Sequence, residues 1–487
     1  MRAPGQERTE EMAGASGGSN PIAVINDTPM GIRQMVVVFL MVLLNALDGF
    51  DVLSSAFAAP GMMAEWSIDR GSIGIILSAE LIGMGFGSVL LGGMADKAGR
   101  KLTMLICLAV MAVGMYLASA STYYPILPGV GGFGWLSDIV LWRFITGLGI
   151  GGMLATTNAV VAETTSKKGR SISMALYVIG YPLGGVVGGF AAQEWLLVVG
   201  TWHDVFLFGA IVTAAMIPLV VVLVPETPAY YAARRPAGAI DKINRSLKAF
   251  GKAAITALPA IKQEGPQPKV TDILSKPQLR KVTLLLAFAY MFHTLTFYYI
   301  LKFAPTIVAG AGFSQADAAS SLTYANIGGA LGGFLFGFLL KKWDIKGPTI
   351  LVLLLGVGAV AYFGMGHETL WSWRVAAFFT MFFLNAAIVG YYAAFARGFP
   401  AYARATGTGF VLGVGRAGAA GSPIIAGFLF NWLGDSELLT VTIIMCSGSV
   451  LGAVLLWFLP ISDADEEAAE AMLADEDQAS APSRATA

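Results

Sequence analysis

The sequence predicts an all-α membrane protein with about twelve transmembrane helices, arranged as two six-helix halves. Hydrophobic residues make up 56% of the 487 residues and charged residues only 13%, and the mean hydropathy is +0.69. A soluble globular chain is less apolar than this. The apolar stretches are long enough to cross a membrane, and they lie on both sides of one hydrophilic connector.

Each apolar stretch approaches the roughly 20 residues that a helix needs to cross a bilayer. We expect six spans before the connector, at 34–60, 71–94, 102–121, 138–161, 172–196 and 205–224. Six more are expected after it, at 282–303, 316–340, 349–365, 373–396, 405–432 and 439–459. The predicted organisation is a disordered tail (1–32), an N-terminal bundle (33–224), a central loop (225–279), a C-terminal bundle (280–460) and an acidic tail (461–487).

Lysine and arginine gather on alternate loops. Examples are Lys97, Lys167 and Lys341, together with many bases of the central loop, whereas the opposite loops carry little beyond Arg70 and Arg374. By the positive-inside rule the basic loops are cytoplasmic. An even number of spans then places both termini in the cytoplasm.

The two halves resemble each other. The segment 163–170 is followed by a glycine-rich run at 180–189, and the segment 399–404 is followed by another at 413–421. Internal repeats around a central loop are typical of secondary transporters, whose binding sites lie near the midplane between the repeats. The glycine-rich runs themselves indicate close helix packing.

The sequence gives little support to an enzyme. Cys107 and Cys446 are isolated in apolar runs, and the three histidines, His203, His293 and His367, lack ligand spacing. We find no nucleophile elbow, phosphate loop or zinc-protease motif. The formal net charge is zero, which gives no indication of a nucleic-acid partner. We therefore expect no metal and no cofactor apart from a coupling ion.

Two carboxylates interrupt the first apolar run. Asp48 and Asp51 are three residues apart, so they share one helix face, and Gly49 between them permits a close backbone approach or a local break. An ionisable residue inside a membrane is costly, and it usually lines a cavity, pairs with a cation or carries protons. A buried structural ion pair is the alternative.

Helical rise suggests partners for these acids. At about 1.5 Å per residue, Asp51 and Arg143 reach nearly the same depth in a core about 30 Å thick. Glu80 and Arg416 both fall near the midplane and could also pair. The two arginines are either structural partners of these acids or a binding site for a substrate carboxylate. Lys302 is expected to extend to the outer surface, or else to hold a second acid group of a larger substrate.

The loop between the second and third spans carries a recognisable pattern. The spacing of 92–101 lets Asp96 meet an arginine or a helix N-terminus, while Gly92 and Gly99 allow tight packing beside Arg100. This stretch resembles the loop signature of the major facilitator superfamily. The resemblance implies a major-facilitator-type fold with a cytoplasmic gating loop.

Other motifs resemble one branch of that superfamily, the aromatic acid:proton symporters. The matching stretches are 48–51, 143–152 with Glu163 at the end of its span, and 404–409 with Arg404 at its start and Arg416 and Pro423 after it. The similarity covers about 34–460. Two departures stand out: Lys341 occupies the position of the signature's acid in the second half, where Asp344 could replace it, and Glu80 replaces a small or apolar residue.

The resemblance implies proton-coupled uptake of an aromatic carboxylate, such as benzoate, a hydroxybenzoate, protocatechuate or vanillate, by a monomer in a bacterial inner membrane. Substrate and proton binding would involve Asp48, Asp51, Arg143, Glu163, Arg416 and Glu80. Stacking against the substrate ring would suit Tyr181, Phe292, Phe297, Tyr298, Tyr324 and Tyr391. A capping role for Glu163 stays open, as do a sugar, aliphatic acid or drug as the substrate and a membrane sensor without transport.

Overall fold

The computed structural model describes residues 20–123, 137–258, 269–340, 343–400 and 403–460. The regular elements in these ranges are helices, and twelve of them are long and apolar enough to cross a membrane. The first six are α3 (Ile32–Trp66), α4 (Arg70–Ala98), α5 (Arg100–Ser119), α6 (Asp138–Thr164), α7 (Arg170–Ala191, continued to Val199 by η2 and α8) and α9 (Trp202–Leu223). The other six are α13 (Pro277–Gly310), α14 (Gln315–Leu339), α15 (Lys346–Gly364), α16 (Leu370–Gly398), α17 (Arg404–Leu433) and α18 (Leu438–Trp457). The predicted all-α class with twelve spans is confirmed.

Two helices run further than predicted. The first span was expected to end near Pro60, but α3 continues through Pro60 to Trp66. The seventh was expected to end at residue 303, but α13 continues through Pro305 to Gly310. Proline stops most helices in water because it lacks an N–H group. In a membrane protein, neighbouring helices can satisfy the backbone groups that it leaves free.

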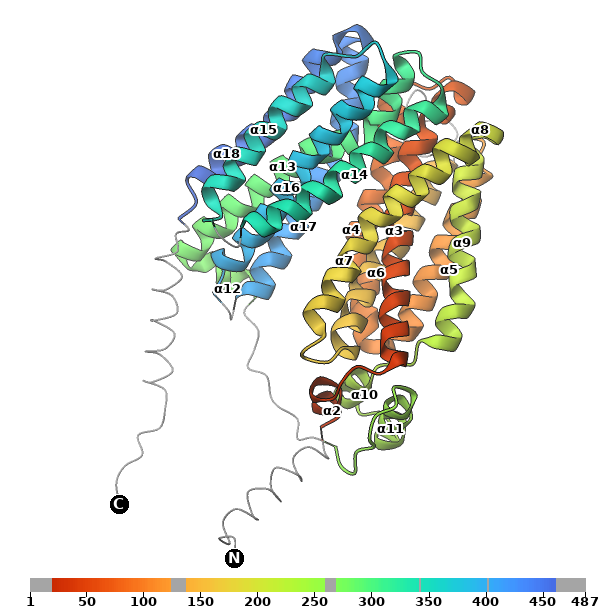
Figure 1. Cartoon of the computed structure of the whole chain (residues 1–487), viewed down its shortest axis with the longest axis vertical. Helices are drawn as coiled ribbons and strands as arrows, with labels where there is room; N and C mark the ends of the chain where they lie inside the picture. Colours follow the sequence, from red (N-terminus) through yellow and green to blue (C-terminus); the bar gives the residue numbers. More distant parts are fainter. Residues whose placement is uncertain (1–19, 124–136, 259–268, 341–342, 401–402, 461–487) are drawn as a thin grey trace, which may run out of the picture. The chain divides into compact units, whose positions relative to one another are not determined.

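The helices cluster into two compact units, coloured along the chain in Figure 1. The first contains the residues up to 263 together with Lys302–Asn326, and the second contains Glu264–Leu301 and the residues from Ile327 onwards. A segment that follows the central loop, comprising the end of α13 and the start of α14, therefore packs with the first six spans. The predicted start of the C-terminal bundle at residue 280 was based on the sequence repeat, and it stays a prediction.

Glycines set the closest helix contacts in the first unit. The most extensive contacts are those of α4 with α6, and α3 packs mainly against α7 and α9. A Cβ built on Gly147 of α6 would overlap the carbonyl oxygen of Glu80, and one built on Gly49 of α3 would overlap that of Tyr181. The backbones therefore approach as closely as helices can. Gly49 allows this approach and does not break α3.

Short helices cover one end of the first unit. They are α2 (Pro21–Asp27), α10 (Pro228–Arg234) and α11 (Ala239–Ala249), and they lie below the ends of the spans in Figure 1. Residues 21–27 of the predicted disordered tail instead form α2, because Asn20 caps the helix and Pro21 starts it. Asn26 also accepts hydrogen bonds from Lys167 N and Arg170, which fixes α2 to the loop between α6 and α7.

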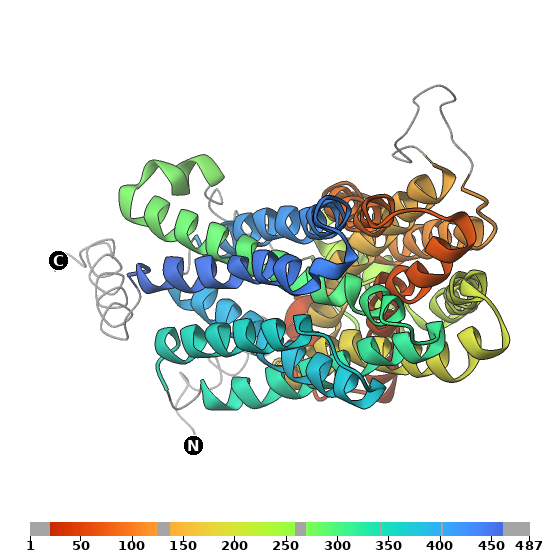
Figure 2. The ribbon, with the colours of Figure 1, turned by 90° about the horizontal axis from the view of Figure 1, so that it is seen from above.

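In the second unit, α15 packs against both α16 and α18, as Figure 1 and Figure 2 show. Its core is apolar and aromatic. Tyr290 and Tyr391 lie in it with ring centroids 5.5 Å apart, and Phe395 lies 5.3 Å from Tyr290. A shorter helix, α12 (Val270–Ser275), precedes α13.

Candidate functional site

Three charged side chains meet in the interior of the first unit. Glu80 of α4, Arg143 of α6 and Lys302 of α13 have no solvent-exposed surface. Glu80 Oε2 lies 2.6 Å from Arg143 Nη2 and 3.2 Å from Lys302 Nζ. It also accepts a hydrogen bond of 3.1 Å from Ser55 Oγ. We call Glu80, Arg143 and Lys302 the buried triad; when all three are ionised, it carries one net positive charge.

Lys302 is fully enclosed. Its ammonium group donates to the Val52 carbonyl oxygen, to Ser55 Oγ at 3.1 Å and to Glu80. Three acceptors thus match its three protons. The expectation that Lys302 reaches the outer surface is wrong, because α13 continues well beyond residue 302 and keeps this side chain inside the bundle.

Arg143 is committed to partners within the same unit. Its Nη2 donates to the backbone oxygen of Asp51 at 3.0 Å as well as to Glu80, and its Nη1 lies 2.9 Å from Met115 Sδ. The guanidinium also stands over the Phe206 ring, 5.0 Å from its centroid. Arg143 and Asp51 therefore meet, as their depths predicted, but through the Asp51 backbone. The carboxylate predicted to pair with Arg416, Glu80, is bound by Arg143 and Lys302.

Asp48 and Asp51 are acids of this region in which neither carboxyl oxygen is satisfied. Both are fully buried, and their four carboxyl oxygens have no hydrogen-bond partner among the described residues. The Thr213 hydroxyl of α9 lies beside Asp51 but outside hydrogen-bonding geometry. A buried carboxylate without donors is strongly disfavoured, whereas the protonated carboxyl is tolerated. The environment therefore suits groups that exchange a proton.

A second charged network lies at the ends of α4, α5 and α6. Arg100 binds Asp96 at 2.7 Å and Glu163 at 2.8 Å, and Glu163 also accepts a bond of 2.6 Å from the Thr227 hydroxyl. Gly99 adopts a φ of +108°, which favours glycine, and a Cβ there would overlap the Glu226 carboxylate. The sequence-predicted residues Asp96, Gly99, Arg100 and Glu163 are thus brought together. Gly92 packs against Ala155 nearby.

Glu226 is a member of this network that the sequence reasoning missed. It accepts the backbone N–H groups of Arg100 at 2.9 Å and Lys101 at 3.1 Å, and so caps the start of α5 from a distant loop. Burial raises the pKa of Glu226, while the backbone donors of Thr227, Arg100 and Lys101 oppose that rise. An acidic residue between two prolines, directly after the sixth apolar run, was the available signal.

In the second unit, Arg416 lies among tyrosines. Arg416 of α17 is half-buried and close enough to Tyr290 of α13 to interact with it electrostatically, as do Tyr298 and Tyr392. Tyr290 packs against Gly415, where a Cβ would overlap its ring, and its ring centroid lies 6.2 Å from that of Tyr392. We call Arg416, Tyr290, Tyr298 and Tyr392 the arginine–tyrosine cluster. It places a cation beside aromatic rings.

The other aromatic candidates divide by burial. Tyr181, Phe292, Phe297, Tyr298 and Tyr324 are half-buried, while Tyr391 is fully buried. Tyr391 donates to the Ala289 carbonyl oxygen at 3.1 Å and stacks on His293 at 5.4 Å. Its hydroxyl and one face are therefore occupied by protein, so it is a core residue in this structure.

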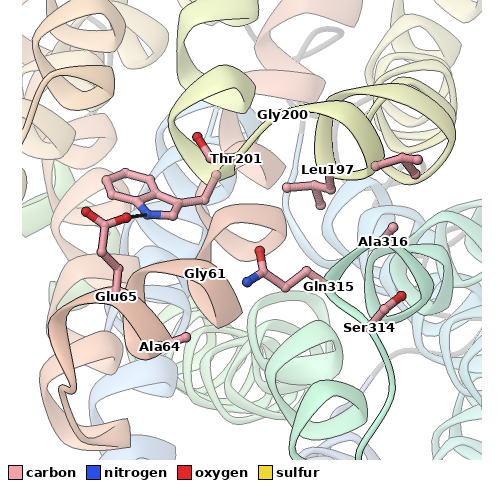
Figure 3. Close-up of a pocket in the computed structure, with 11 residues that line it drawn as sticks. Gly61, Ala64, Glu65, Leu197, Gly200, Thr201, Ser314, Gln315 and Ala316 are labelled. Atoms are coloured by element: carbon pink, nitrogen blue, oxygen red, sulfur yellow. Dashed lines mark hydrogen bonds between the residues drawn. The ribbon is translucent and has the colours of Figure 1, made fainter.

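A pocket lies at the end of α3 remote from α2, and we call it the outer pocket because the predicted orientation places that end outside. It has a volume of about 660 Å³, and its walls come from α3, the α8–α9 connection and the start of α14. Figure 3 shows Gln315 directed towards Gly61, and its dashed line marks the hydrogen bond that Glu65 accepts from the Trp202 indole. The Trp202 Nε1 donates to Glu65 at 2.6 Å, and His203 lies 3.2 Å from the same carboxylate.

A family model described as Major Facilitator Superfamily matches residues 38–410. The chain belongs to the major facilitator superfamily. It is 28% identical to a gallate transporter of Pseudomonas putida, over 84% of this chain and 88% of that protein. It is also 28% identical to the 4-hydroxybenzoate transporter PcaK of Pseudomonas aeruginosa, over 91% and 96% of the two chains. A benzoate transport protein of Acinetobacter baylyi is 26% identical, over 84% of this chain and 86% of that protein.

Solved structures show the same major facilitator fold. The inward-open xylose transporter XylE of Escherichia coli superposes with a TM-score of 0.64 at 15% identity, covering 90% of this chain and 99% of that one. The nucleoside transporter NupG gives 0.63 at 17% identity, with 88% and 100% covered. The predicted superfamily is confirmed, and the chain is a multi-pass membrane protein from a family of transporters, not of enzymes.

Membership of the superfamily bears on the two loop signatures. In the first half, the signature residues form the Arg100 network described above. In the second half, Lys341 lies outside the described residues, and Asp344 accepts the backbone N–H of Ile345 at 2.7 Å. Arg404 donates to the Phe399 carbonyl oxygen at 3.3 Å. Among the described residues, no group of three His, Cys, Asp or Glu side chains could hold a metal ion.

Proposed function

We propose that this transporter imports an aromatic carboxylate together with protons across the inner membrane of a bacterium, by alternating access. The relatives named above carry gallate, 4-hydroxybenzoate and benzoate in their names, which supports a substrate of this class. Both termini are cytoplasmic in this proposal, since the basic loops are. The protein acts as a monomer, and protons are its coupling ion.

The arginine–tyrosine cluster is the observation that carries the proposed substrate. A guanidinium presents two parallel donors to a carboxylate, and tyrosine rings stack against an aromatic ring. Of the two arginines expected to bind the acid, Arg143 is fully enclosed, whereas Arg416 is half-buried and accessible. We therefore assign carboxylate binding to Arg416 and ring contacts to Tyr298 and Tyr392, while Tyr290, which is buried in the core of the unit, packs behind them.

Proton coupling follows from the energetics of an anion. Moving one negative charge into a negative-inside cell costs about 2.3 kcal/mol per 100 mV. Co-transported protons offset that cost. Asp48 and Asp51 are the carriers in this proposal, because both are buried without hydrogen-bond donors and share one face of α3. The Arg100 network, with Glu163 and Glu226, would hold the cytoplasmic ends of α4, α5 and α6 together in one of the transport states.

The first experiment is uptake of labelled aromatic acids into proteoliposomes, with a pH gradient and a membrane potential imposed separately. The panel should include benzoate, 4-hydroxybenzoate, protocatechuate, vanillate and gallate. We expect at least one acid to accumulate only when the lumen is more alkaline than the medium. A further requirement for membrane potential would indicate more than one proton per anion. Uptake of a sugar or a nucleoside in place of every acid would contradict the proposal.

The proton carriers are tested by Asp48→Asn and Asp51→Asn. Each variant should lose gradient-driven accumulation, by more than tenfold, while it still inserts in the membrane, because asparagine keeps the shape but cannot carry the proton. Asp241→Asn is the matched control, since Asp241 is exposed on α11. Full accumulation by both membrane variants would remove these residues from the mechanism.

A further inference from the structure

A segment of the second sequence repeat is held on the first six spans. Lys302–Asn326 clusters with those spans although it lies beyond the central loop. Near its start, Lys302 reaches Val52, Ser55 and Glu80. Further along, the Asn326 side chain packs against Gly185 of α7, and the Thr323 side chain packs against Gly189. A Cβ built on either glycine would overlap the facing side chain. We call Lys302–Asn326 the docked segment.

Lys302 sets the net charge of the buried site around Arg143. Arg143 and Lys302 are cations that both bind the Glu80 carboxylate, and the Asp51 carboxyl lies within electrostatic range of Arg143 and Glu80. With the segment docked, Asp48 protonated because it lacks donors, and these four groups ionised, the sum is zero. Without Lys302 the same site holds one cation and two acids, and its sum is −1. A buried site cannot keep an uncompensated charge cheaply, so it would then take up one proton.

We infer that Lys302 and the coupling proton occupy this site alternately, each as its single exchangeable positive charge. When the docked segment leaves, Lys302 leaves with it, and a proton binds to the acids around Arg143. When the segment returns, the ammonium group neutralises the site and the proton departs. The exchange is a plain acid–base step: one carboxyl O–H bond forms or breaks, and the proton passes to or from water.

Direction follows from the side on which docking occurs. The docked segment begins beside the triad and continues to the outer pocket, where Gln315 meets Gly61 (Figure 3). Undocking therefore opens the path from the outer pocket to the triad, and the proton enters from outside. Docking closes that path, so the proton that Lys302 displaces leaves on the other side. This inference rests on proton-coupled uptake and specifies the residue that enforces it.

Other titratable groups face this site and must be separated from it. Asp48 of α3 lies within electrostatic range of Asp51, Cys107 of α5 and Tyr177 of α7. The Glu65–His203 pair lies at the outer pocket. The test therefore uses variants of the triad and, for comparison, a variant of His203.

The measurement is a distance between spin labels on Ala64→Cys and Ala316→Cys, both at the outer pocket, in the full chain in nanodiscs. Cys107 and Cys446 are replaced beforehand. No substrate is needed. We expect the short-distance population to grow as the pH rises, by up to tenfold in the docked-to-undocked ratio per pH unit, because undocking takes up one proton. A ratio that does not change between pH 5 and pH 9 would overturn the inference.

Three variants and two controls make the charge count testable. Lys302→Met should remove the pH dependence, since both states then need the proton. Glu80→Gln should favour the undocked state at every pH, because Lys302 would bring an excess charge. The double variant should recover docking without pH dependence, which a merely structural role would not give. Lys281→Met, an exposed lysine of the same helix, and His203→Gln should behave like the wild type.

Transport separates failure of this inference from failure of the proposed function. If the wild type shows no proton-driven uptake of any acid, the proposed function fails, whereas the spin-label result still decides the exchange. If the wild type is coupled, Lys302→Met should keep substrate counterflow within about twofold and lose at least tenfold of its gradient-driven accumulation. Unchanged accumulation in Lys302→Met would contradict the role of Lys302 and leave the symporter intact.

Discussion

At the scale of single residues, the two intramembrane arginines, Arg143 and Arg416, differ in burial and in their partners. Arg143 is fully buried, and its two Nη groups contact Glu80, the Asp51 backbone oxygen and Met115. Arg416 is half-buried beside Tyr290. Arginine pairs with a carboxylate through two parallel hydrogen bonds, which lysine cannot form. The geometry of the planar fork, and not charge alone, should therefore matter at position 416.

Arg416→Lys tests this difference. The variant keeps the positive charge but loses the fork, so we expect the KM for the aromatic acid to rise about tenfold, equivalent to about 1.4 kcal/mol. Initial rates of uptake over a range of acid concentrations measure it. Arg374→Lys serves as the control, because Arg374 is also half-buried but lies near the start of α16. An unchanged KM would place carboxylate binding elsewhere.

At the scale of the helices, the contact of α4 with α6 fixes the distance between Glu80 and Arg143. The two backbones touch at Gly147, where a methyl group would overlap the Glu80 carbonyl oxygen. Gly85 of α4 has open space around its Cβ position. The same substitution should thus have opposite effects at the two sites.

We expect Gly147→Ala to destabilise the protein by about 1–3 kcal/mol through overpacking, and to reduce uptake because Glu80 is displaced. Gly85→Ala should be neutral or slightly stabilising, since alanine favours a helix by up to about 1 kcal/mol. Thermal unfolding in detergent and uptake in liposomes provide the two readouts. Equal melting temperatures for the two variants would show that α4 and α6 can separate without cost.

The cap of α5 gives a pH dependence. Burial raises the pKa of Glu226 above its ordinary value of 4.5. A raised acid pKa means that the folded state binds the proton more tightly, so this contribution to stability is complete below 4.5 and is lost as the pH rises through the folded-state pKa. Wild-type protein should therefore lose stability across that window, and Glu226→Gln should not.

The quantity to measure is the difference in Tm between Glu226→Gln and the wild type, from pH 4 to pH 8. It should increase with pH, by on the order of 2 °C. The offset at any one pH is less informative, because glutamine cannot accept from both Arg100 and Lys101 as the carboxylate does. Glu368→Gln, exposed between α15 and α16, should give a constant difference. A difference that falls with pH would contradict the raised pKa of Glu226.

The helix ends also show where sequence reasoning reached its limit. Apolar length predicts each span, but Pro60 and Pro305 lie inside α3 and α13, where the sequence suggested their ends. The error at α13 placed Lys302 at a surface, when it is buried. Depth also brought Asp51 and Arg143 together correctly. It could not give the rotation of α4, and so the pairing of Glu80 with Arg143 and Lys302 was not predicted.

At the scale of the whole molecule, topology is the property that composition predicts best. Twelve spans and the bias of lysine and arginine to alternate loops predict which loops face the cytoplasm. The arrangement of charges within each unit depends on helix rotation and on contacts between segments distant in sequence. The docked segment is the clearest case, since the repeat pattern assigns it to the other half.

Cysteine labelling can check the topology. Both native cysteines are buried, so an introduced thiol is read against a low background. A cysteine at Glu368 should react with an impermeant maleimide in intact cells, because the proposed orientation places that loop outside. A cysteine at Asp241, exposed on α11, should react only after the membrane is opened. The reverse pattern would invert the proposed orientation.

The glycine contact of α4 with α6 has a consequence for how such a transporter can change over time. Glu80 and Arg143 are joined across helices that leave no room for one methyl group, whereas the arginine–tyrosine cluster draws its side chains from α13, α16 and α17. Mutations that alter the choice of acid can therefore accumulate away from the contact of α4 with α6 that joins Glu80 and Arg143. A laboratory library that varies Tyr290, Tyr298 and Tyr392 should yield new substrates that are still driven by protons.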